Sequence, residues 1–200
     1  MQVQLPDVDT TWTIHSGRPM SEDEYFEFCV RNDNLRIERT AGGEILIMAP
    51  TGFETGYRNS DLTRQLSTWA RQDAQGVALD SNTEYILPNG AARSPDASWI
   101  RRDRLAGFSK KQLRKFLPVC PDFVVELTSP TDRLATVQAK MREWIENGAA
   151  LGWLLDPDRG TAYVYRPGLE PERIDAPNEL RGEGLMVGFC LELGEIWAGL

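Results

Sequence analysis

Two short apolar runs, residues 123–128 and 151–155, constrain the fold of this chain of 200 residues more than any other feature. Between them, residues 133–147 carry apolar side chains at helical spacing, and Gly148 provides a helix stop. A strand, a helix and a second strand in this order usually pair the strands in parallel through a right-handed crossover. The sequence therefore predicts an α/β fold with a parallel strand pair at its centre.

The first apolar run contains a carboxylate that is costly to bury. Side chains alternate between the two faces of a strand, so Glu126 shares one face with Val124 and Thr128. A carboxylate on an apolar face needs a partner, which is either an opposite charge or a bound cation. Glu126 is therefore either half of a structural ion pair or part of a metal site.

A second carboxylate, Asp96, opens another predicted strand at residues 97–100. It follows Pro95, so a role in a turn or a cap is one explanation for it. The alternative is that Asp96 and Glu126 bracket a hard divalent cation, which prefers oxygen ligands and keeps bound waters.

Lys140 lies on the predicted helix that follows Glu126. It is three residues after Val137 and four before Trp144, so it borders the apolar stripe of that helix. Its amine either snorkels into solvent or reaches the sheet, where it would orient a water or stabilise charge on a phosphate. Asp96, Glu126 and Lys140 together predict a metal-dependent nuclease centre.

The remaining segments complete a mixed α/β pattern. A capping box with an acidic first turn predicts a helix over residues 21–32, and alternating residues predict a hairpin over 35–48. Residues 1–19 are expected to form an irregular arm. We expect further helices at 56–72, 110–116 and around Ile196 and Trp197, and strands at 77–79, 84–87, 161–166, 173–174 and 185–187.

Composition restricts the cellular location. No apolar run approaches the roughly 20 residues of a membrane span, and the first residues lack an apolar signal core, so we expect a cytoplasmic protein. The three cysteines are odd in number and far apart, which favours reduced thiols over a disulfide framework. A single histidine excludes a multi-histidine metal site.

The net charge of −8 argues against broad affinity for nucleic acid, because neutralisation of phosphates supplies much of that affinity. Basic residues nevertheless gather in residues 101–115, where Asp103 is the one acid. This segment is either a solvated helix face or a strip beside Asp96 that contacts phosphates. The candidate DNA-binding residues are Arg101, Arg102, Lys110 and Lys111.

Other side chains have simpler explanations. Glu54 and Asn59 suit the start of a helix, with support of a metal site as the alternative. Glu84 is expected on a solvent-facing side of its strand. Trp144 and Trp153 are expected in the core and not as platforms for nucleobases.

Several motifs together resemble a known family over nearly the whole chain. They are LRIERTAGGEI (35–45), APTG (49–52), SPDASWI (94–100), CPDFVVELTSP (120–130), QAKMREWIENGAALGWLLDP (138–157), VYRPG (164–168) and VGFCLELGEIW (187–197). The chain is similar to the PD-(D/E)XK nuclease superfamily and, within it, to the bacterial restriction-endonuclease-like family called Uma-two.

This resemblance implies a single restriction-endonuclease-like domain over residues 1–200, with a mixed β-sheet flanked by helices and an N-terminal helix and hairpin. Asp96 is similar to the first superfamily acid, Glu126 is similar to the second, and Glu38 matches a family acid that is a third candidate metal ligand. The lysine expected two residues after the second acid is replaced by Thr128, and the resemblance implies that Lys140 takes its place.

The resemblance further implies a magnesium-dependent DNA endonuclease, with manganese as an alternative metal, that is often a homodimer. The sequence leaves two alternatives open. One is a non-catalytic nuclease-fold module that binds nucleic acid or a protein partner. The other is a metal-dependent phosphoesterase on another substrate, which the acidic charge favours. An intact set of two acids and a lysine favours the enzyme over the module.

Overall fold

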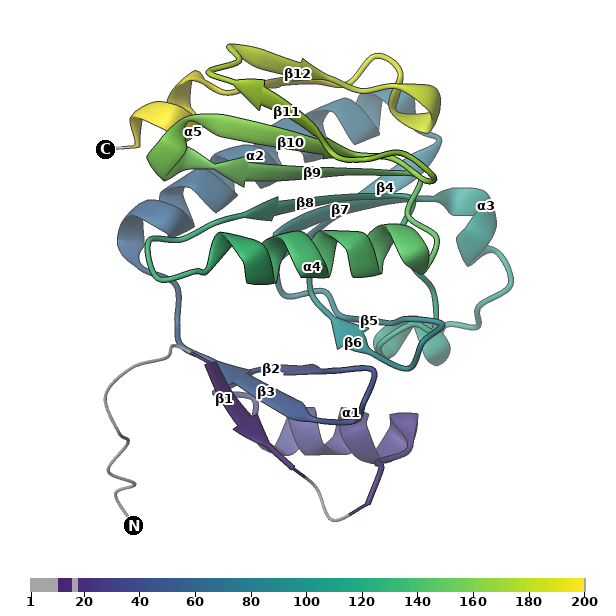
Figure 1. Ribbon diagram of the computed structural model, residues 1–200. Helices are drawn as coiled ribbons and strands as arrows, with labels where there is room; N and C mark the ends of the chain where they lie inside the picture. The colour runs from purple at the N-terminus through teal and green to yellow at the C-terminus, as the bar shows by residue number, and fades with distance from the viewer. Residues whose placement is uncertain (1–10, 16–17, 200) are drawn as a thin grey trace.

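The computed structural model describes residues 11–15 and 18–199. Its larger sheet has six strands in the order β11-β10-β9-β8-β7-β4, with β8 and β9 parallel and the other neighbours antiparallel (Figure 1). The strands are β4 (Gly76–Asp80), β7 (Ala97–Arg101), β8 (Phe123–Leu127), β9 (Leu151–Asp156), β10 (Thr161–Tyr165) and β11 (Glu172–Asp175). Helix α4 (Leu134–Glu146) links β8 to β9, which confirms the predicted strand–helix–strand unit.

A second sheet lies below the first in Figure 1 and contains the N-terminal strands. Its order is β1-β3-β2-β6-β5, with β1 (Thr11–Ile14), β2 (Arg36–Arg39), β3 (Ile45–Met48), β5 (Tyr85–Ile86) and β6 (Ala92–Arg93). Helix α1 (Glu22–Arg31) packs on it through Tyr25, which lies against Ile37 and Ile45. The helix and hairpin are confirmed, whereas β1 corrects the expected irregular arm; residues 1–10 and 16–17 of that arm lie outside the described residues.

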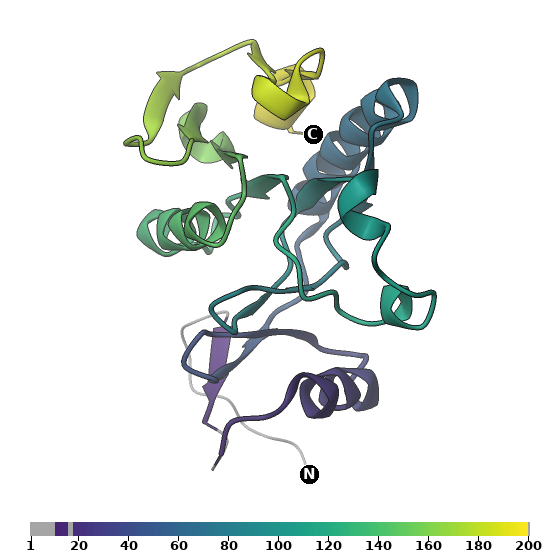
Figure 2. The same cartoon turned by 90° about the vertical axis from the view of Figure 1, so that its right-hand side faces the viewer.

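Two long helices cover opposite faces of the six-stranded sheet (Figure 2). On one face, α2 (Phe53–Asp73) buries Leu62 and Leu66 against Phe123 of β8. On the other face, α4 buries Met141 and Trp144 against Val124. The alternation predicted for β8 is therefore present, and Glu126 lies on the α4 face.

Helix α4 packs closely on the sheet where β9 has a glycine. A Cβ atom added to Gly152 would lie 2.5 Å from Met141 Cε and 3.4 Å from Val124 Cγ2. The absence of a side chain at this position lets Met141 lie directly over the strand. This packing sets how far Lys140, the preceding residue, stands from β8.

The C-terminal segment adds a small two-stranded sheet, β12 (Glu179–Arg181) with β13 (Cys190–Glu192), and the short helix α5 (Gly194–Ala198). The strand expected at residues 185–187 is wrong, because residues 184–186 form a 3₁₀ turn. Gly184, the first residue of this turn, and Gly188, two residues after it, have positive φ and bend the chain out of an extended path.

The basic segment after β7 is less helical than expected. Helix α3 (Arg102–Leu105) is one turn long, and residues 110–116 contain only the 3₁₀ turn Gln112–Arg114. Leu113 is exposed, so this segment lacks the buried apolar face that stabilises a longer helix. In the part of the chain that is described, no helix is long and apolar enough to cross a membrane.

Candidate active site

The register of two central strands brings the two predicted acids together. Strands β7 and β8 are antiparallel, with Ala97 opposite Val125. One further step of the same register places Asp96 opposite Glu126. These residues are only 7% and 4% exposed. Because like charges at opposing strand positions repel each other, this pair needs compensation from elsewhere.

A third acid, Glu38, comes from the other sheet. The chain passes from β6 in the smaller sheet directly into β7 in the larger one, so residues 92–97 join the two sheets. β2 pairs with β6 at Arg39 and Ala92. The backbone N–H of Ser94 then donates to Glu38 Oε1 at 3.1 Å. Glu38 is 2% exposed and lies at the junction of the sheets.

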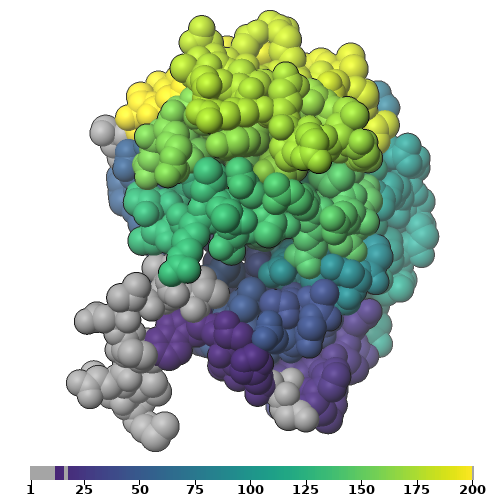
Figure 3. All heavy atoms as spheres, in the orientation of Figure 1, coloured from purple at the N-terminus to yellow at the C-terminus, as the bar shows by residue number. Residues whose placement is uncertain are grey.

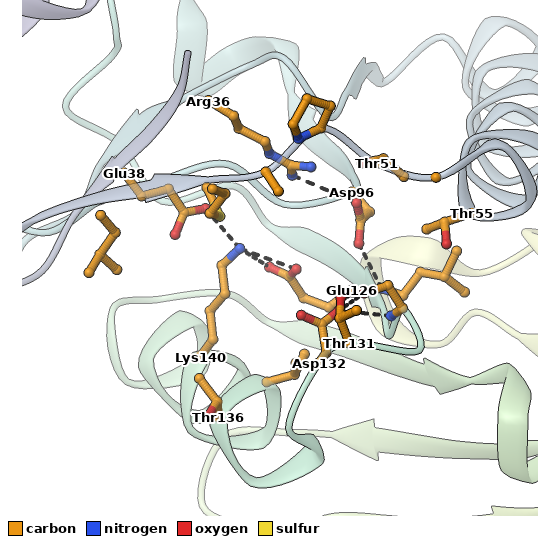
Figure 4. Close-up of a pocket in the computed structure, with 18 of the residues that line it drawn as sticks. Arg36, Glu38, Thr51, Thr55, Asp96, Glu126, Thr131, Asp132, Thr136 and Lys140 are labelled. Atoms are coloured by element: carbon orange, nitrogen blue, oxygen red, sulfur yellow. Dashed lines mark hydrogen bonds and ion pairs between the residues drawn. The ribbon is translucent and has the colours of Figure 1, made fainter. Parts of the chain in front are cut away.

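Lys140 joins Glu38 to Glu126 (Figure 4). Its Nζ lies 2.9 Å from Glu38 Oε1 and 3.0 Å from Glu126 Oε1, and it donates to the carbonyl oxygen of Ser94 at 2.9 Å. One turn later on α4, Trp144 donates its indole N–H to Glu126 Oε1 at 2.8 Å. The sequence prediction that Lys140 reaches the sheet beside Glu126 is correct in its geometry.

Asp96 has a different set of partners. Its Oδ2 accepts from the backbone N–H of Leu127 at 2.8 Å, and its Oδ1 accepts from Asn59 Nδ2 at 3.0 Å. Arg36 Nη2 stands 3.8 Å from the same Oδ1, which is too far for a hydrogen bond. Asn59 Oδ1 and Arg36 Nε are buried and have no hydrogen-bond partner among the described residues.

Burial raises the pKa of Glu126 to about 7, and the negative charges of Asp96 and Glu38 add to this, against the opposing effect of Lys140. Burial also disfavours the charged form of Glu38, but Lys140 and Arg93 outweigh it and hold the pKa of Glu38 below its ordinary value. Burial lowers the pKa of Lys140, whereas Glu126 and Glu38 raise it more strongly. Of the two glutamates that share Lys140, Glu126 is thus the one whose pKa is raised towards neutral pH.

These side chains lie at the base of an open cleft of about 860 Å³. Its walls are β2 and β3, the start of α2, the loop after β8 and the face of α4. Figure 3 shows this side of the molecule hollowed between α4 in green and the N-terminal sheet in purple and blue. Solvent molecules therefore have access to acids that are otherwise buried.

The basic strip is not part of this cleft. Asp96 precedes β7, whereas Arg101 ends it, which separates the two by about 16 Å along an extended strand. Arg101 lies 3.3 Å from Asp103, and Arg102 donates to the carbonyl oxygen of Ala74. Arg101, Arg102, Lys110 and Lys111 are absent from the residues that line the cleft. Their expected position next to Asp96 is therefore wrong.

The structure adds residues that sequence reasoning missed. Arg93 donates to Glu38 Oε2 at 3.1 Å and to Glu143 Oε2 at 2.6 Å, so it shares the charge of Glu38 with Lys140. The spacing of Trp144 four residues after Lys140 was visible in the sequence and signals a common face. No local signal marks Arg93, because its partners come from α4 and from the other sheet.

Glu84 was expected to face solvent, and this is wrong. It is buried and accepts a hydrogen bond from the Tyr25 hydroxyl at 2.7 Å. Burial raises the pKa of Glu84 to about 8. Helix α1 covers this carboxylate, and that contact joins residues far apart in the chain.

The donor atoms suit a hard divalent cation. Within residues 11–15 and 18–199, no three Asp, Glu, His or Cys side chains are grouped closely enough to form a ready-made metal site. Mg²⁺, however, commonly binds through one or two carboxylates and keeps several waters. Asp96 and Glu126 supply such carboxylates, and the unpartnered Asn59 Oδ1 is a further oxygen beside Asp96. The donor set therefore fits a partly hydrated Mg²⁺ or Mn²⁺.

Comparison with solved structures finds a crystal structure described as "a putative nuclease belonging to DUF820", from Anabaena variabilis. The match has a TM-score of 0.69 and 20% sequence identity and covers 90% of this chain and 98% of that one. At this identity it shows a common fold: a mixed sheet flanked by helices, as the resemblance implied. Comparison with curated proteins finds no match.

The sequence profile of a family described as "Uma2: Putative restriction endonuclease" matches residues 22–194. This range includes all three acids, Lys140 and every described strand apart from β1. The chain therefore belongs to the Uma2 family of nuclease-like proteins.

Proposed function

We propose that this protein is a metal-dependent DNA endonuclease. Asp96 and Glu126 would hold Mg²⁺ or Mn²⁺ at the base of the cleft. The observation that carries the proposal is the placement of two buried carboxylates at opposing strand positions, open to solvent on one side. The membership of the chain in the Uma2 family supports a nuclease. A bound ion would lower the pKa of a coordinated water and polarise the scissile phosphodiester.

Lys140 would act on the attacking water or on the charge that develops on the phosphate. Its ammonium is held by Glu38 and by the Ser94 carbonyl oxygen, which fixes its position at the cleft base. Glu38 is a third candidate ligand. Each of its oxygens is bound to a different cation, Oε1 to Lys140 and Oε2 to Arg93, and this double neutralisation favours a positioning role for Glu38 over direct metal binding.

The decisive experiment is cleavage of supercoiled plasmid in the presence of Mg²⁺ or Mn²⁺. We expect the wild type to produce nicked and linear DNA, EDTA to prevent this, and Lys140→Ala to lose at least about 100-fold in rate. Arg181→Ala, which removes an exposed cation outside the cleft, is the matched control and should cleave like the wild type. Equal cleavage by wild type and Lys140→Ala would contradict the proposed centre.

A metal-dependent phosphoesterase on a smaller substrate is the second candidate. Three basic residues line the cleft against six acids, and the whole chain has a net charge of −8, which disfavours a long polyanion. A small aromatic phosphodiester distinguishes the two, because a phosphoesterase would hydrolyse it and leave plasmid intact. A nuclease-fold module without activity would bind nucleic acid or a protein and hydrolyse neither substrate.

Two further expectations concern the protein in its cell. We propose a homodimer and a cytoplasmic location. Sedimentation velocity of the purified chain tests the first. Fractionation of the source cells tests the second.

A further inference from the structure

We propose that the rim of the cleft next to α2 is a subsite for an unpaired nucleotide of single-stranded nucleic acid. Arg36 would bind its phosphate, and Phe53 would stack on its base. The inference rests on the proposed nuclease function, because it places the substrate strand across the same acids. It adds a preference for unpaired strands, which the nuclease proposal does not require.

The first observation concerns the three basic residues that line the cleft. Lys140 donates to Glu38 and Glu126, and Arg93 donates to Glu38 and Glu143. The side chain of Arg36 makes no hydrogen bond to any residue that the structure describes: its buried Nε lacks a partner, and its Nη2 has only the long ion pair with Asp96 at 3.8 Å. Among the cleft cations it is therefore the one whose N–H donors are unused.

The position of Arg36 suits a phosphate that enters the active site. It lies two residues before Glu38 on β2, so both side chains leave the same face of the strand. Figure 4 shows its guanidinium directed towards Asp96, at 3.8 Å from Oδ1. A guanidinium has a planar fork of donors that matches two phosphate oxygens. Arg36 is thus placed to hold a phosphate beside Asp96.

The second observation is an exposed aromatic ring at the same rim. Phe53 is the first residue of α2 and lines the cleft. It is 84% exposed, more than any other large apolar side chain of the described residues. At this exposure the ring contributes little to the packing of the fold. Aromatic rings beside a phosphate site are a common means of binding single strands, because every base offers a face for stacking.

The charges around the cleft favour a single strand over a duplex. A base in a duplex is already stacked and offers no free face to Phe53. The basic strip that would follow a duplex backbone lies at the far end of β7. Glu54 and Asp132 also line the cleft, and they would repel a densely charged double helix. A short unpaired segment needs only one phosphate contact and one stacked base at this rim.

The test is the binding of a fluorescently labelled single-stranded oligothymidylate, measured by anisotropy at low salt with EDTA so that no cleavage occurs. We expect Phe53→Ala and Arg36→Ala each to weaken binding about tenfold and Phe53→Trp to restore it. Leu169→Ala and Arg181→Ala are exposed matched controls far from the cleft and should bind like the wild type. A duplex of the same length should bind more weakly than the single strand, without dependence on Phe53.

An oligonucleotide of abasic sites separates the two contacts. On this ligand the effect of Phe53→Ala should disappear, while that of Arg36→Ala persists. The subsite is overturned if the wild type does not bind the single strand, or if Phe53→Ala binds it like Leu169→Ala. It is also overturned if Phe53→Ala changes only the sedimentation coefficient, since Phe53 would then serve self-association.

These results are independent of cleavage. A wild type that binds the single strand through Phe53 but leaves plasmid intact in Mg²⁺ would refute the endonuclease and keep the subsite. A wild type that cuts plasmid but shows no dependence on Phe53 in binding would refute the subsite alone.

Discussion

An acid stands at each end of β8, and the two acids have opposite surroundings. Asp122 precedes the strand and accepts from the Arg101 backbone N–H at 3.0 Å and from Arg104 Nη1 at 2.9 Å. Glu126 near the other end shares Lys140 with Glu38 and stands opposite Asp96. The two acids are similarly buried, at 7% and 4% exposed. Burial alone therefore does not distinguish a structural acid from a candidate catalytic one; the balance of charge around it does.

The largest difference in stability between the two ends of β8 is expected when the cation beside each acid is removed. Lys140→Met leaves Glu38 and Glu126 without their shared ammonium, so we expect a loss of about 3 kcal/mol in the free energy of unfolding, together with loss of cleavage. Arg104→Met should cost only about 1 kcal/mol, because this arginine is partly exposed and Asp122 keeps its backbone partner. Urea unfolding of both variants measures the contrast. Equal losses would mean that the two ends are equivalent.

When each acid is replaced by its neutral amide, the variant at Asp122 should lose more stability than the variant at Glu126. Glu126→Gln keeps an oxygen for the Trp144 indole and removes repulsion from Asp96 and Glu38, so its stability at pH 8 should equal or exceed that of the wild type. Asp122→Asn weakens two charge-assisted hydrogen bonds and should lose about 1–2 kcal/mol. In the plasmid assay only Glu126→Gln should be inactive. Inactivity of Asp122→Asn with an intact fold would extend the site to the other end of the strand.

Stabilisation by a metal ion should also distinguish Glu126 from Asp122. Mg²⁺ or Mn²⁺ at about 100 times its dissociation constant should stabilise the wild type by about 2.7 kcal/mol, which raises Tm by about 5 °C or more. Glu126→Ala should respond hardly at all, whereas Asp122→Asn should respond like the wild type. Thermal melts with and without EDTA test this. The same rise in wild type and Glu126→Ala would remove Glu126 from the metal site.

The pH dependence of stability follows from the raised pKa of Glu126, which moves from 4.5 to about 7. Between these values the folded protein keeps a proton that the unfolded chain has released, so the contribution of Glu126 to stability falls as pH rises. Glu126→Gln should flatten the fall between pH 4.5 and 7. Part of it should remain, because burial raises the pKa of Glu84 to about 8. Unfolding curves over this range would contradict the assignment if Asp122→Asn flattened the profile as strongly.

The smallest effects are expected from the basic strip near Asp122. Lys110 and Lys111 lie outside the cleft. Replacing either one by Ala should therefore change the affinity for the single-stranded oligonucleotide by less than about twofold. Arg101→Ala and Arg102→Ala should behave in the same way if they fold. A tenfold loss in any of them would restore the strip as a nucleic-acid contact.

The parts of the site that follow local rules could be predicted from the sequence. Strand alternation placed Glu126, and helical spacing placed Lys140 on the face that reaches it. The partners of Arg93 and Arg36 could not be predicted, since they depend on how residues 92–97 join two sheets. The prediction that Glu84 faces solvent was wrong for a similar reason, because Tyr25, which covers it, is 59 residues away in the chain. Strand β1 was missed although Thr11–Ile14 is rich in β-branched and aromatic residues, because such a short run becomes a strand only through the edge that β3 offers it.

The close packing of α4 over Gly152 has a consequence for how such proteins diverge. Lys140 is tied to the acids by the docking of a helix and not by a set number of residues along a strand. Changes in the length of the loop at residues 128–133 should therefore be tolerated, whereas a one-residue insertion in α4 between Lys140 and Met141 would turn its amine by about 100° away from the acids. In this chain the position of the amine is therefore set by helical phase: Lys140 comes just before Met141, the side chain that rests on a strand glycine.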